Sequence, residues 1–268
     1  MFLNIDVRCA MRVVILAGGE GRRLHPYTTV LPKPMMPVGD MPILEILLRQ
    51  LRRFGIDRVT ISVGHLGELI MAFFQDGSRW GIKIDYVVED KPLGTMGPLR
   101  LIKDFEAPFL VMNGDLLTTL NFLDLYTYHE SHDRVATVAT YEKEIQLSLG
   151  VLETETEDDR TVTSFSEKPV YTYKVSMGVY AFNLDILSFI PDNTSFGFDT
   201  LMHTLLEKQI PISTFPFKGR WFDIGRQNDY RVATTVFERH RTEFLPEEPP
   251  ARPTTIKPLA NDVTPEEY

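Results

Sequence analysis

A glycine-rich segment followed by positively charged side chains is the part of the chain best suited to chemistry. An apolar run over residues 13–17 leads into three glycines, and two arginines and a proline-flanked lysine follow. Because glycine has no Cβ and can adopt positive φ, the backbone N–H groups of such a loop can close around phosphate oxygens. The pattern predicts a nucleoside triphosphate site that comprises Leu16, Ala17, Gly18, Gly19, Gly21, Arg22, Arg23 and Lys33.

Two better-known phosphate-binding loops do not fit this segment. The Walker loop ends in Gly-Lys-Ser/Thr, whereas Gly21 is followed by Arg22. The dinucleotide fingerprint requires a third glycine where this chain has Leu24. For the loop taken alone, a glycine turn without any ligand stays open as an alternative.

Two carboxylates follow apolar stretches further along the chain. Asp115 comes after residues 109–112 and Asn113-Gly114, and Asp223 lies in the segment WFDIG. Each alone is compatible with an ordinary turn or capping aspartate. Facing a triphosphate together they could hold Mg²⁺, which is usually bound by one or two carboxylates plus substrate phosphates. A zinc site is disfavoured because no His or Cys cluster lies nearby.

The segment Ser166-Glu167-Lys168-Pro169 places an acid and a base side by side. Lys168 could bind a phosphate while Glu167 accepts hydrogen bonds from sugar hydroxyls, and in an extended strand the two side chains would point to opposite faces. An exposed charge pair without function is the alternative.

The apolar pattern predicts an α/β fold. Strands are expected over 13–17, 59–63, 82–88 and 109–112, and helices over 43–54, 66–74 and 95–103. This alternation predicts a Rossmann-like, doubly wound sheet that is mostly parallel, with its ligand cleft at the carboxyl ends of the strands. After residue 135 the expected strands lie closer together, which indicates antiparallel additions that form a lobe beside the parallel half. Helices are expected again over 199–209 and 228–241.

Composition limits the function classes and the domain organisation. The 268 residues are 43% hydrophobic, and a net charge of −9 argues against binding to nucleic acid or to an anionic membrane. The single Cys9 and the lack of a long apolar run predict a cytoplasmic protein. We expect an N-terminal extension over 1–10, one catalytic domain over 11–245, and a mobile Pro/Glu-rich tail over 246–268.

Six motifs together resemble those of the sugar-1-phosphate nucleotidyltransferases, the nucleotide-sugar pyrophosphorylases. They are GGEGRRLHPYTTVLPKP, PLGTMGPL, NGD, SEKP, MGVYAFN and WFDIG, and the resemblance covers roughly residues 11–235. It implies a mixed sheet of the nucleotide-diphospho-sugar transferase type with an antiparallel sugar-binding lobe. It also implies transfer of a nucleotidyl group from a nucleoside triphosphate to a sugar-1-phosphate, with Mg²⁺ as cofactor and pyrophosphate as the second product.

The resemblance assigns roles to individual residues. Arg23 would hold the triphosphate and Lys33 the α-phosphate with the incoming oxygen, so that loss of either is expected to affect rate far more than stability. No general base is needed, because the nucleophile is already an oxyanion. The remaining implied ligands are Asp115 and Asp223 for Mg²⁺, Gly94 and Thr95 for the nucleotide, and Lys168, Glu167, Gly150 and Gly178 for the sugar phosphate.

One position bears on the choice of base. Glu89 stands where thymidylyl- and uridylyltransferases of this family typically have Gln. A carboxylate only accepts hydrogen bonds, which suits the adjacent donors of guanine, and PLGTMGPL is most similar to mannose-1-phosphate guanylyltransferases. We therefore expect GTP, with thymidylyl, uridylyl or cytidylyl transfer as alternatives.

The sugar and the assembly stay open at this level. Ser176 stands where guanylyltransferases for mannose commonly have Asn, so another hexose, an amino sugar or a heptose phosphate is compatible with the sequence. A non-catalytic paralogue that senses nucleotide-sugars is the alternative from another class, and a homo-oligomer is a further expectation.

Overall fold

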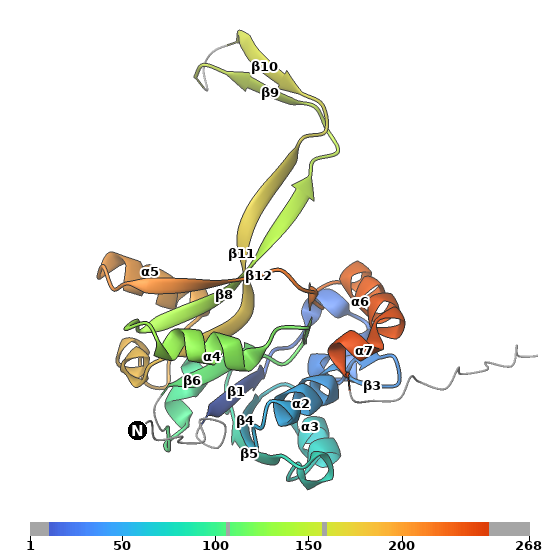
Figure 1. Ribbon diagram of the computed structural model, residues 1–268, viewed down its shortest axis with the longest axis vertical. Helices are drawn as coiled ribbons and strands as arrows, with labels where there is room; N and C mark the ends of the chain where they lie inside the picture. Colours follow the sequence, from blue (N-terminus) through green and yellow to red (C-terminus); the bar gives the residue numbers. More distant parts are fainter. Residues whose placement is uncertain (1–10, 106–107, 157–159, 247–268) are drawn as a thin grey trace, which may run out of the picture.

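The computed structural model describes residues 11–105, 108–156 and 160–246 (Figure 1). The expected extension over 1–10 lies outside the described residues, as does the expected tail apart from Pro246. Among the described residues, no helix is long and apolar enough to cross a membrane.

A seven-stranded sheet runs through the centre of the molecule in the order β12-β8-β11-β6-β1-β4-β5. Only β11 runs antiparallel to its neighbours in this sheet, whereas the pairs β1/β4, β1/β6, β4/β5 and β8/β12 are parallel. The predicted doubly wound mixed sheet is confirmed. Its strands are β1 (Arg12–Ala17), β4 (Arg58–Val63), β5 (Lys83–Val88), β6 (Phe109–Asn113), β8 (Ala136–Gln146), β11 (Val170–Phe182) and β12 (Ile212–Phe217).

Apolar side chains on the two faces of the sheet form two separate cores. Val13 and Ile15 pack into one core and Val14 into the other, as the alternation of a buried strand requires. The first core is covered by α2 (Ile43–Arg53), α3 (Gly67–Phe74) and α4 (Phe122–Glu130). The second is covered by α5 (Phe198–Glu207) and the short 3₁₀ turns η5 (Gly97–Leu101) and η6 (Leu184–Phe189).

Two local predictions differ from the structure. The helix expected over 95–103 is only the 3₁₀ turn η5, because Pro98 disfavours the α conformation of the residue before it, Gly97, which also has low helix propensity. Helix α4 was not expected. Its start is marked by Asn121, whose side chain accepts hydrogen bonds from the N–H groups of Leu123 and Asp124.

A third apolar cluster closes the region beside the sheet. It joins Leu24, Met36 and Leu117 to helices α6 (Gln227–Arg239) and α7 (Arg241–Phe244). Here β7 (Leu116–Thr118) pairs antiparallel with β13 (Trp221–Asp223), and Asp223 lies opposite Leu116. The remaining short elements outside the ribbon described next are the strands β2 (Pro37–Val38) and β3 (Met41–Pro42) and the 3₁₀ turns η1 (Arg22–Leu24), η2 (Tyr27–Thr29), η3 (Lys33–Met35) and η4 (Ser78–Trp80).

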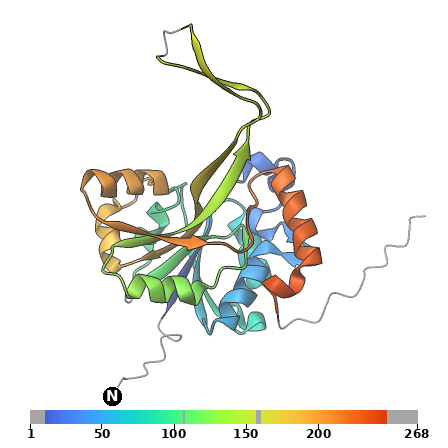
Figure 2. The same cartoon turned by 45° about the horizontal axis from the view of Figure 1, so that its top comes forward.

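Strands β8 and β11 extend beyond the sheet as a two-stranded ribbon. The last residue of β8 that pairs with β12 is Tyr141, and from there β8 pairs only with β11 as far as Gln146 and Val170. The ribbon carries β9 (Val151–Thr154) and β10 (Val162–Ser166) at its far end. We call the described residues from 142 to 174 the arm. Figures 1 and 2 show that the arm projects away from the body, whereas the sequence predicts a lobe beside the sheet.

Candidate functional site

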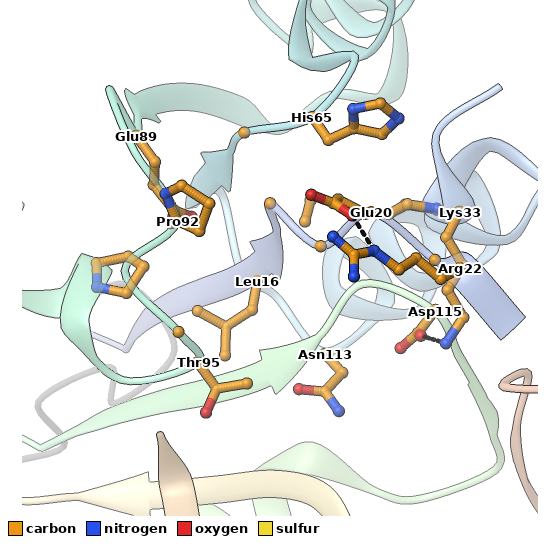
Figure 3. A pocket seen from close by; sticks show the side chains of 18 of the residues that line it. Leu16, Glu20, Arg22, Lys33, His65, Glu89, Pro92, Thr95, Asn113 and Asp115 are labelled. Atoms are coloured by element: carbon orange, nitrogen blue, oxygen red, sulfur yellow. Dashed lines mark hydrogen bonds and ion pairs between the residues drawn. The ribbon is translucent and has the colours of Figure 1, made fainter. Parts of the chain in front are cut away.

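A cavity of about 790 Å³ opens at the carboxyl ends of β1, β4, β5 and β6, where a doubly wound sheet is expected to bind ligands (Figure 3). Most of the predicted nucleotide-site residues meet there although they come from distant parts of the chain. Those that line the cavity are Leu16, Ala17, Gly18, Gly19, Gly21, Arg22, Arg23, Lys33, Glu89, Gly94, Thr95 and Asp115.

The glycine loop follows directly from the end of β1. Gly21 has a φ of +64°, and a Cβ there would lie 2.9 Å from Cγ2 of Thr28. The Thr28 hydroxyl donates to the Gly21 carbonyl at 2.9 Å and fixes the turn. A Cβ on Gly18 would overlap Oε1 of Glu89, whereas Gly19 has no neighbour within 4 Å of that position. Gly21 is therefore required by its backbone conformation, a side chain at position 18 would displace the Glu89 carboxylate, and Gly19 leaves open space.

The Glu89 carboxylate is held in one orientation at the edge of this loop. Its Oε1 accepts a hydrogen bond from the Ser62 hydroxyl at 2.9 Å, and its Oε2 accepts one from the Leu93 N–H at 3.1 Å. Burial raises the pKa of the Glu89 carboxyl, while these two donors oppose the shift. A carboxylate has about four acceptor positions, so each oxygen retains capacity for a ligand.

Lys33 lies between the two predicted metal-binding carboxylates. Its Nζ forms an ion pair with Oδ2 of Asp115, and the same Nζ is 3.9 Å from Oδ1 of Asp223. Figure 3 shows the Lys33 and Asp115 side chains pointing toward one another. Lys33 and Asp115 are mostly shielded from solvent, whereas Asp223 is about half exposed. Both aspartates that the sequence predicts as metal ligands therefore lie close enough to the Lys33 ammonium to interact with its charge.

The position of Asp115 is set by backbone pairing. The N–H of Gly114 donates to the carbonyl of Leu16 at 2.9 Å, which ties the end of β6 to the end of β1. Burial raises the pKa of the Asp115 carboxyl, Lys33 opposes this shift, and Asp223 adds to it. A second cation near Asp115 would favour the ionised form of its carboxyl and would oppose the effect of burial.

The two arginines of the loop differ in their surroundings. Arg22 is largely exposed and forms an ion pair with Glu20. Arg23 lies against Gly225, where a Cβ would be 3.2 Å from Nη2 of Arg23. No ion pair of Arg23 is found among the described residues. Arg23 is thus a cation on the cavity wall that is available to an anionic ligand.

Carboxylate chemistry at the site fits a divalent ion that is also held by phosphates. Within 11–105, 108–156 and 160–246, no three or more His, Cys, Asp or Glu side chains are grouped so that they could hold a metal ion. Asp115 and Asp223 offer only oxygen ligands, and burial disfavours the charged form of Asp115. Two carboxylates completed by substrate phosphates are a usual arrangement for Mg²⁺.

The predicted sugar-phosphate residues do not join this cavity within one chain. Gly178, with a φ of +72°, packs against the side chain of Asn113, which does line the cavity. Gly150, Glu167 and Lys168 belong to the arm. The backbone at Lys168 has a φ of +47° instead of the extended conformation, and its Nζ is 3.7 Å from Oε1 of Glu167, so the two side chains lie together.

Several residues that sequence reasoning did not assign to the site also line the cavity, among them His65, Lys91 and Asn113. His65 donates its N–H to the carbonyl of Gly18 at 3.2 Å, and Asn113 is the last residue of β6. Their signal in the sequence is their place at the carboxyl end of a strand or within three residues after it.

Comparisons with known proteins agree with this geometry. Residues 12–239 match the model of the nucleotidyl transferase family. Together with the curated relatives below, this match shows that the chain belongs to the sugar-1-phosphate nucleotidyltransferases of that family.

Two curated relatives act on different nucleotides. The UTP–glucose-1-phosphate uridylyltransferase of Synechocystis is 32% identical over 240 residues, which cover 82% of this chain and 61% of the relative. The mannose-1-phosphate guanyltransferase of Schizosaccharomyces pombe is 30% identical over 247 residues, which cover 88% of this chain and 68% of the relative. The chain thus spans between three fifths and seven tenths of the length of these relatives.

A solved structure shares the fold. HddC from Yersinia pseudotuberculosis complexed with GMP-PN is 26% identical, with a TM-score of 0.65, and the match covers 85% of this chain and 99% of that one.

Proposed function

We propose that the protein transfers a nucleotidyl group from a nucleoside triphosphate to a sugar-1-phosphate. A phosphate oxygen of the sugar-1-phosphate attacks the α-phosphorus, the bond from that phosphorus to the bridging oxygen of the β-phosphate breaks, and pyrophosphate leaves. No proton has to move, because the attacking oxygen is already ionised. The observation that carries the proposal is the position of Lys33, which lines the cavity of the glycine loop and contacts both Asp115 and Asp223.

Electrostatics accounts for the catalytic roles. Two anions repel each other, and negative charge develops on the leaving pyrophosphate, so that fixed cations lower the barrier. Arg23, on the cavity wall, is suited to hold the triphosphate and its leaving group. Lys33 is suited to the α-phosphate and the incoming oxygen.

Asp115 and Asp223 would hold Mg²⁺ in the complex with the nucleotide. The ion would supply charge neutralisation for the phosphates. The support for this assignment is the oxygen-only chemistry of the two side chains and their shared contact with Lys33.

GTP is the nucleotide that Glu89 favours. Guanine presents the N1–H and the exocyclic amino group side by side as donors, whereas uracil or thymine O4 would face a carboxylate oxygen. The support is that Ser62 and Leu93 fix the Glu89 carboxylate at the cavity wall. The guanyltransferase of Schizosaccharomyces pombe and the uridylyltransferase of Synechocystis are similarly related to this chain. Similarity to these relatives therefore does not separate GTP from UTP, and the proposal of GTP depends on Glu89.

The acceptor is a hexose or heptose 1-phosphate, giving a GDP-sugar. Gly178 and Asn113 form the wall next to the expected sugar position, and Ser176 leaves more room there than the Asn of mannose enzymes. Glu167, Lys168 and the backbone of Gly150 are the further sugar-phosphate ligands that we propose. The cytoplasm is the compartment we propose for the reaction, because nucleoside triphosphates are available there.

A substrate matrix tests this proposal. Purified protein with Mg²⁺ is supplied with GTP, UTP, dTTP or CTP against a panel of sugar-1-phosphates, and pyrophosphate release is measured. The expected result is turnover that requires both substrates and is fastest with GTP. Faster turnover with UTP or dTTP would contradict the assignment of the base, and nucleotide-sugar binding without any turnover would favour a regulatory paralogue.

A further inference from the structure

The end of strand β4 holds Glu89 by its backbone and by its side chain. Glu89 directly follows β5, and its N–H donates to the carbonyl of Val63 at 2.9 Å, which continues the pairing of β4 with β5. Its carboxylate accepts hydrogen bonds from the Ser62 hydroxyl at 2.9 Å and from the Leu93 N–H at 3.1 Å. Ser62 and Val63 are the last two residues of β4, so a single rigid element determines where Glu89 lies.

The Ser62 hydroxyl depends on this contact as much as the carboxylate does. The Ser62 side chain is completely buried, and within the described part of the chain Glu89 is its one hydrogen-bond partner. If the Glu89 side chain turned away, the hydroxyl would stay buried without a partner, which is unfavourable. The two groups therefore stabilise one orientation of each other.

The glycine loop limits the same carboxylate on another side. A Cβ on Gly18 would overlap Oε1 of Glu89, so this oxygen lies directly against the loop. Because Glu89 also lines the cavity, the acceptor positions that these contacts leave free are those open to a ligand. Ser62, Leu93 and Gly18 together thus determine how the carboxylate is presented to a ligand.

The charges that line the cavity indicate which part of a nucleotide meets Glu89. Figure 3 shows Glu89 across the cavity from the ion pair of Lys33 with Asp115. A carboxylate repels phosphates, whereas the ammonium of Lys33 attracts them. A nucleotide in this cavity would therefore place its phosphates toward Lys33 and its base toward Glu89.

Recognition of guanine by a carboxylate depends on both orientation and charge. The N1–H and the 2-amino group of guanine are adjacent donors, and an ionised carboxylate that is suitably oriented accepts from both. Burial of Glu89 disfavours the ionised form and raises its pKa, while the hydrogen bond from Ser62 opposes this shift. Loss of the Ser62 hydroxyl would weaken both requirements at once.

We propose that Ser62 is a positioning residue for base selection and that, through Glu89, it enables the site to recognise the 2-amino group of guanine. This role rests on the proposed function, in which Glu89 contacts the base. It adds a residue that does not touch the nucleotide, because Ser62 is buried and is not among the residues that line the cavity.

The same strand offers a matched control. Thr60 lies two residues before Ser62 on β4, so the two side chains point to the same face of the sheet. Thr60 is also buried, but its hydroxyl has no hydrogen-bond partner among the residues that the structure describes. Thr60→Val therefore removes a buried hydroxyl from β4 without affecting Glu89.

The test compares binding of GTP with binding of inosine triphosphate, which lacks only the 2-amino group. Calorimetric titrations are run with Mg²⁺ and without sugar phosphate, and circular dichroism verifies that each variant folds. Wild type is expected to bind GTP at least about tenfold more tightly than inosine triphosphate. Ser62→Ala is expected to lower this ratio roughly fivefold, mainly through weaker binding of GTP, whereas Thr60→Val keeps the wild-type ratio.

A double variant separates positioning from a general effect on the fold. In a Glu89→Ala background, Ser62→Ala should leave the ratio of the two affinities unchanged, because the carboxylate through which Ser62 acts is absent. An unchanged ratio in Ser62→Ala alone, or a fall of the same size in Thr60→Val or in the Glu89→Ala background, overturns the proposal.

Failure of the proposed function gives a different result. Wild type would then bind GTP selectively and respond to Ser62→Ala as expected, but it would release no pyrophosphate with any sugar-1-phosphate. A wild type that binds GTP and inosine triphosphate equally overturns both the role of Ser62 and the assignment of GTP.

Discussion

Lys33 and Asp115 form an ion pair at the wall of the cleft, with side chains that are only 13% and 14% exposed. The same ammonium is 3.9 Å from Asp223. Removing one partner of a shielded pair leaves the other charge without compensation, which is strongly unfavourable. The sequence-based expectation that Lys33 affects rate far more than stability therefore needs revision.

Lys33→Met is predicted to lower both activity and stability. The free energy of unfolding should fall by on the order of 3 kcal/mol, because Asp115 keeps its buried position without a counter-charge. The double variant Lys33→Met/Asp115→Asn should regain most of that stability and none of the activity. Urea unfolding and initial rates measure the two effects. Full stability in the single variant would show that the pair does not stabilise the fold.

Arg23→Ala is predicted to affect the rate alone. Turnover should fall by roughly 10²-fold or more, as for the loss of a fixed group that stabilises developing charge, while the melting temperature stays unchanged. The neighbouring Arg22→Ala is the control, since Arg22 is 79% exposed and paired with Glu20, and its loss should cost far less. Equal losses of rate for the two arginines would contradict the role assigned to Arg23.

Much of the nucleotide half could be predicted from sequence, because its signals are local. The apolar run over 13–17 and the glycines after it lie next to one another in the chain, and the structure has β1 and the loop at these positions. Asp115 was found in the same way, from its place after a buried strand. The contribution of His65 to the cavity wall was not predicted, because nothing in the sequence distinguishes a histidine after Gly64 from an ordinary loop residue.

Features that depend on distant pairing could not be predicted from sequence. The register that sets Asp223 opposite Leu116 joins segments more than one hundred residues apart. The direction in which the arm extends is a second such feature. The strand patterns of the arm indicate hairpins, but no local signal shows whether a two-stranded ribbon folds onto its own sheet or extends away from it, since that depends on what covers its apolar face.

Gly18→Ala is predicted to displace the Glu89 carboxylate. The added methyl group would overlap Oε1 of Glu89, so that the hydrogen bonds from Ser62 and Leu93 are weakened, at about 1–2 kcal/mol of stability. Gly19→Ala is the matched control, because nothing lies within 4 Å of its Cβ position. Thermal unfolding should separate the two variants. A Gly19→Ala protein as unstable as Gly18→Ala would argue against this packing.

Glu89→Gln is predicted to change the pH dependence of stability. Burial raises the pKa of Glu89 in the folded protein above its ordinary value of 4.5. The stability that this group contributes is therefore fully present below pH 4.5 and is lost as pH rises through the folded pKa. The variant lacks this dependence, so its melting temperature should gain on that of wild type as pH rises above 4.5. A difference that is constant with pH would contradict the shifted pKa.

Removal of divalent ions is predicted to abolish turnover without unfolding the protein. Asp115 and Asp223 are too few to bind a metal tightly without substrate phosphates, so EDTA should leave the melting temperature unchanged. Added Mg²⁺ should restore the rate, and Asp223→Asn should raise the Mg²⁺ concentration required for half-maximal activity. Full turnover in EDTA would rule out the metal role of this pair.

The central claim, attack of a sugar phosphate oxygen on the α-phosphorus, is tested most directly by isotope transfer. The sugar-1-phosphate carries ¹⁸O in its phosphate oxygens, the second substrate is unlabelled GTP, and the products are separated and analysed by mass spectrometry. The account predicts that all label is found in the nucleotide-sugar and none in pyrophosphate. Label in pyrophosphate, or pyrophosphate formed without the sugar phosphate, would contradict it.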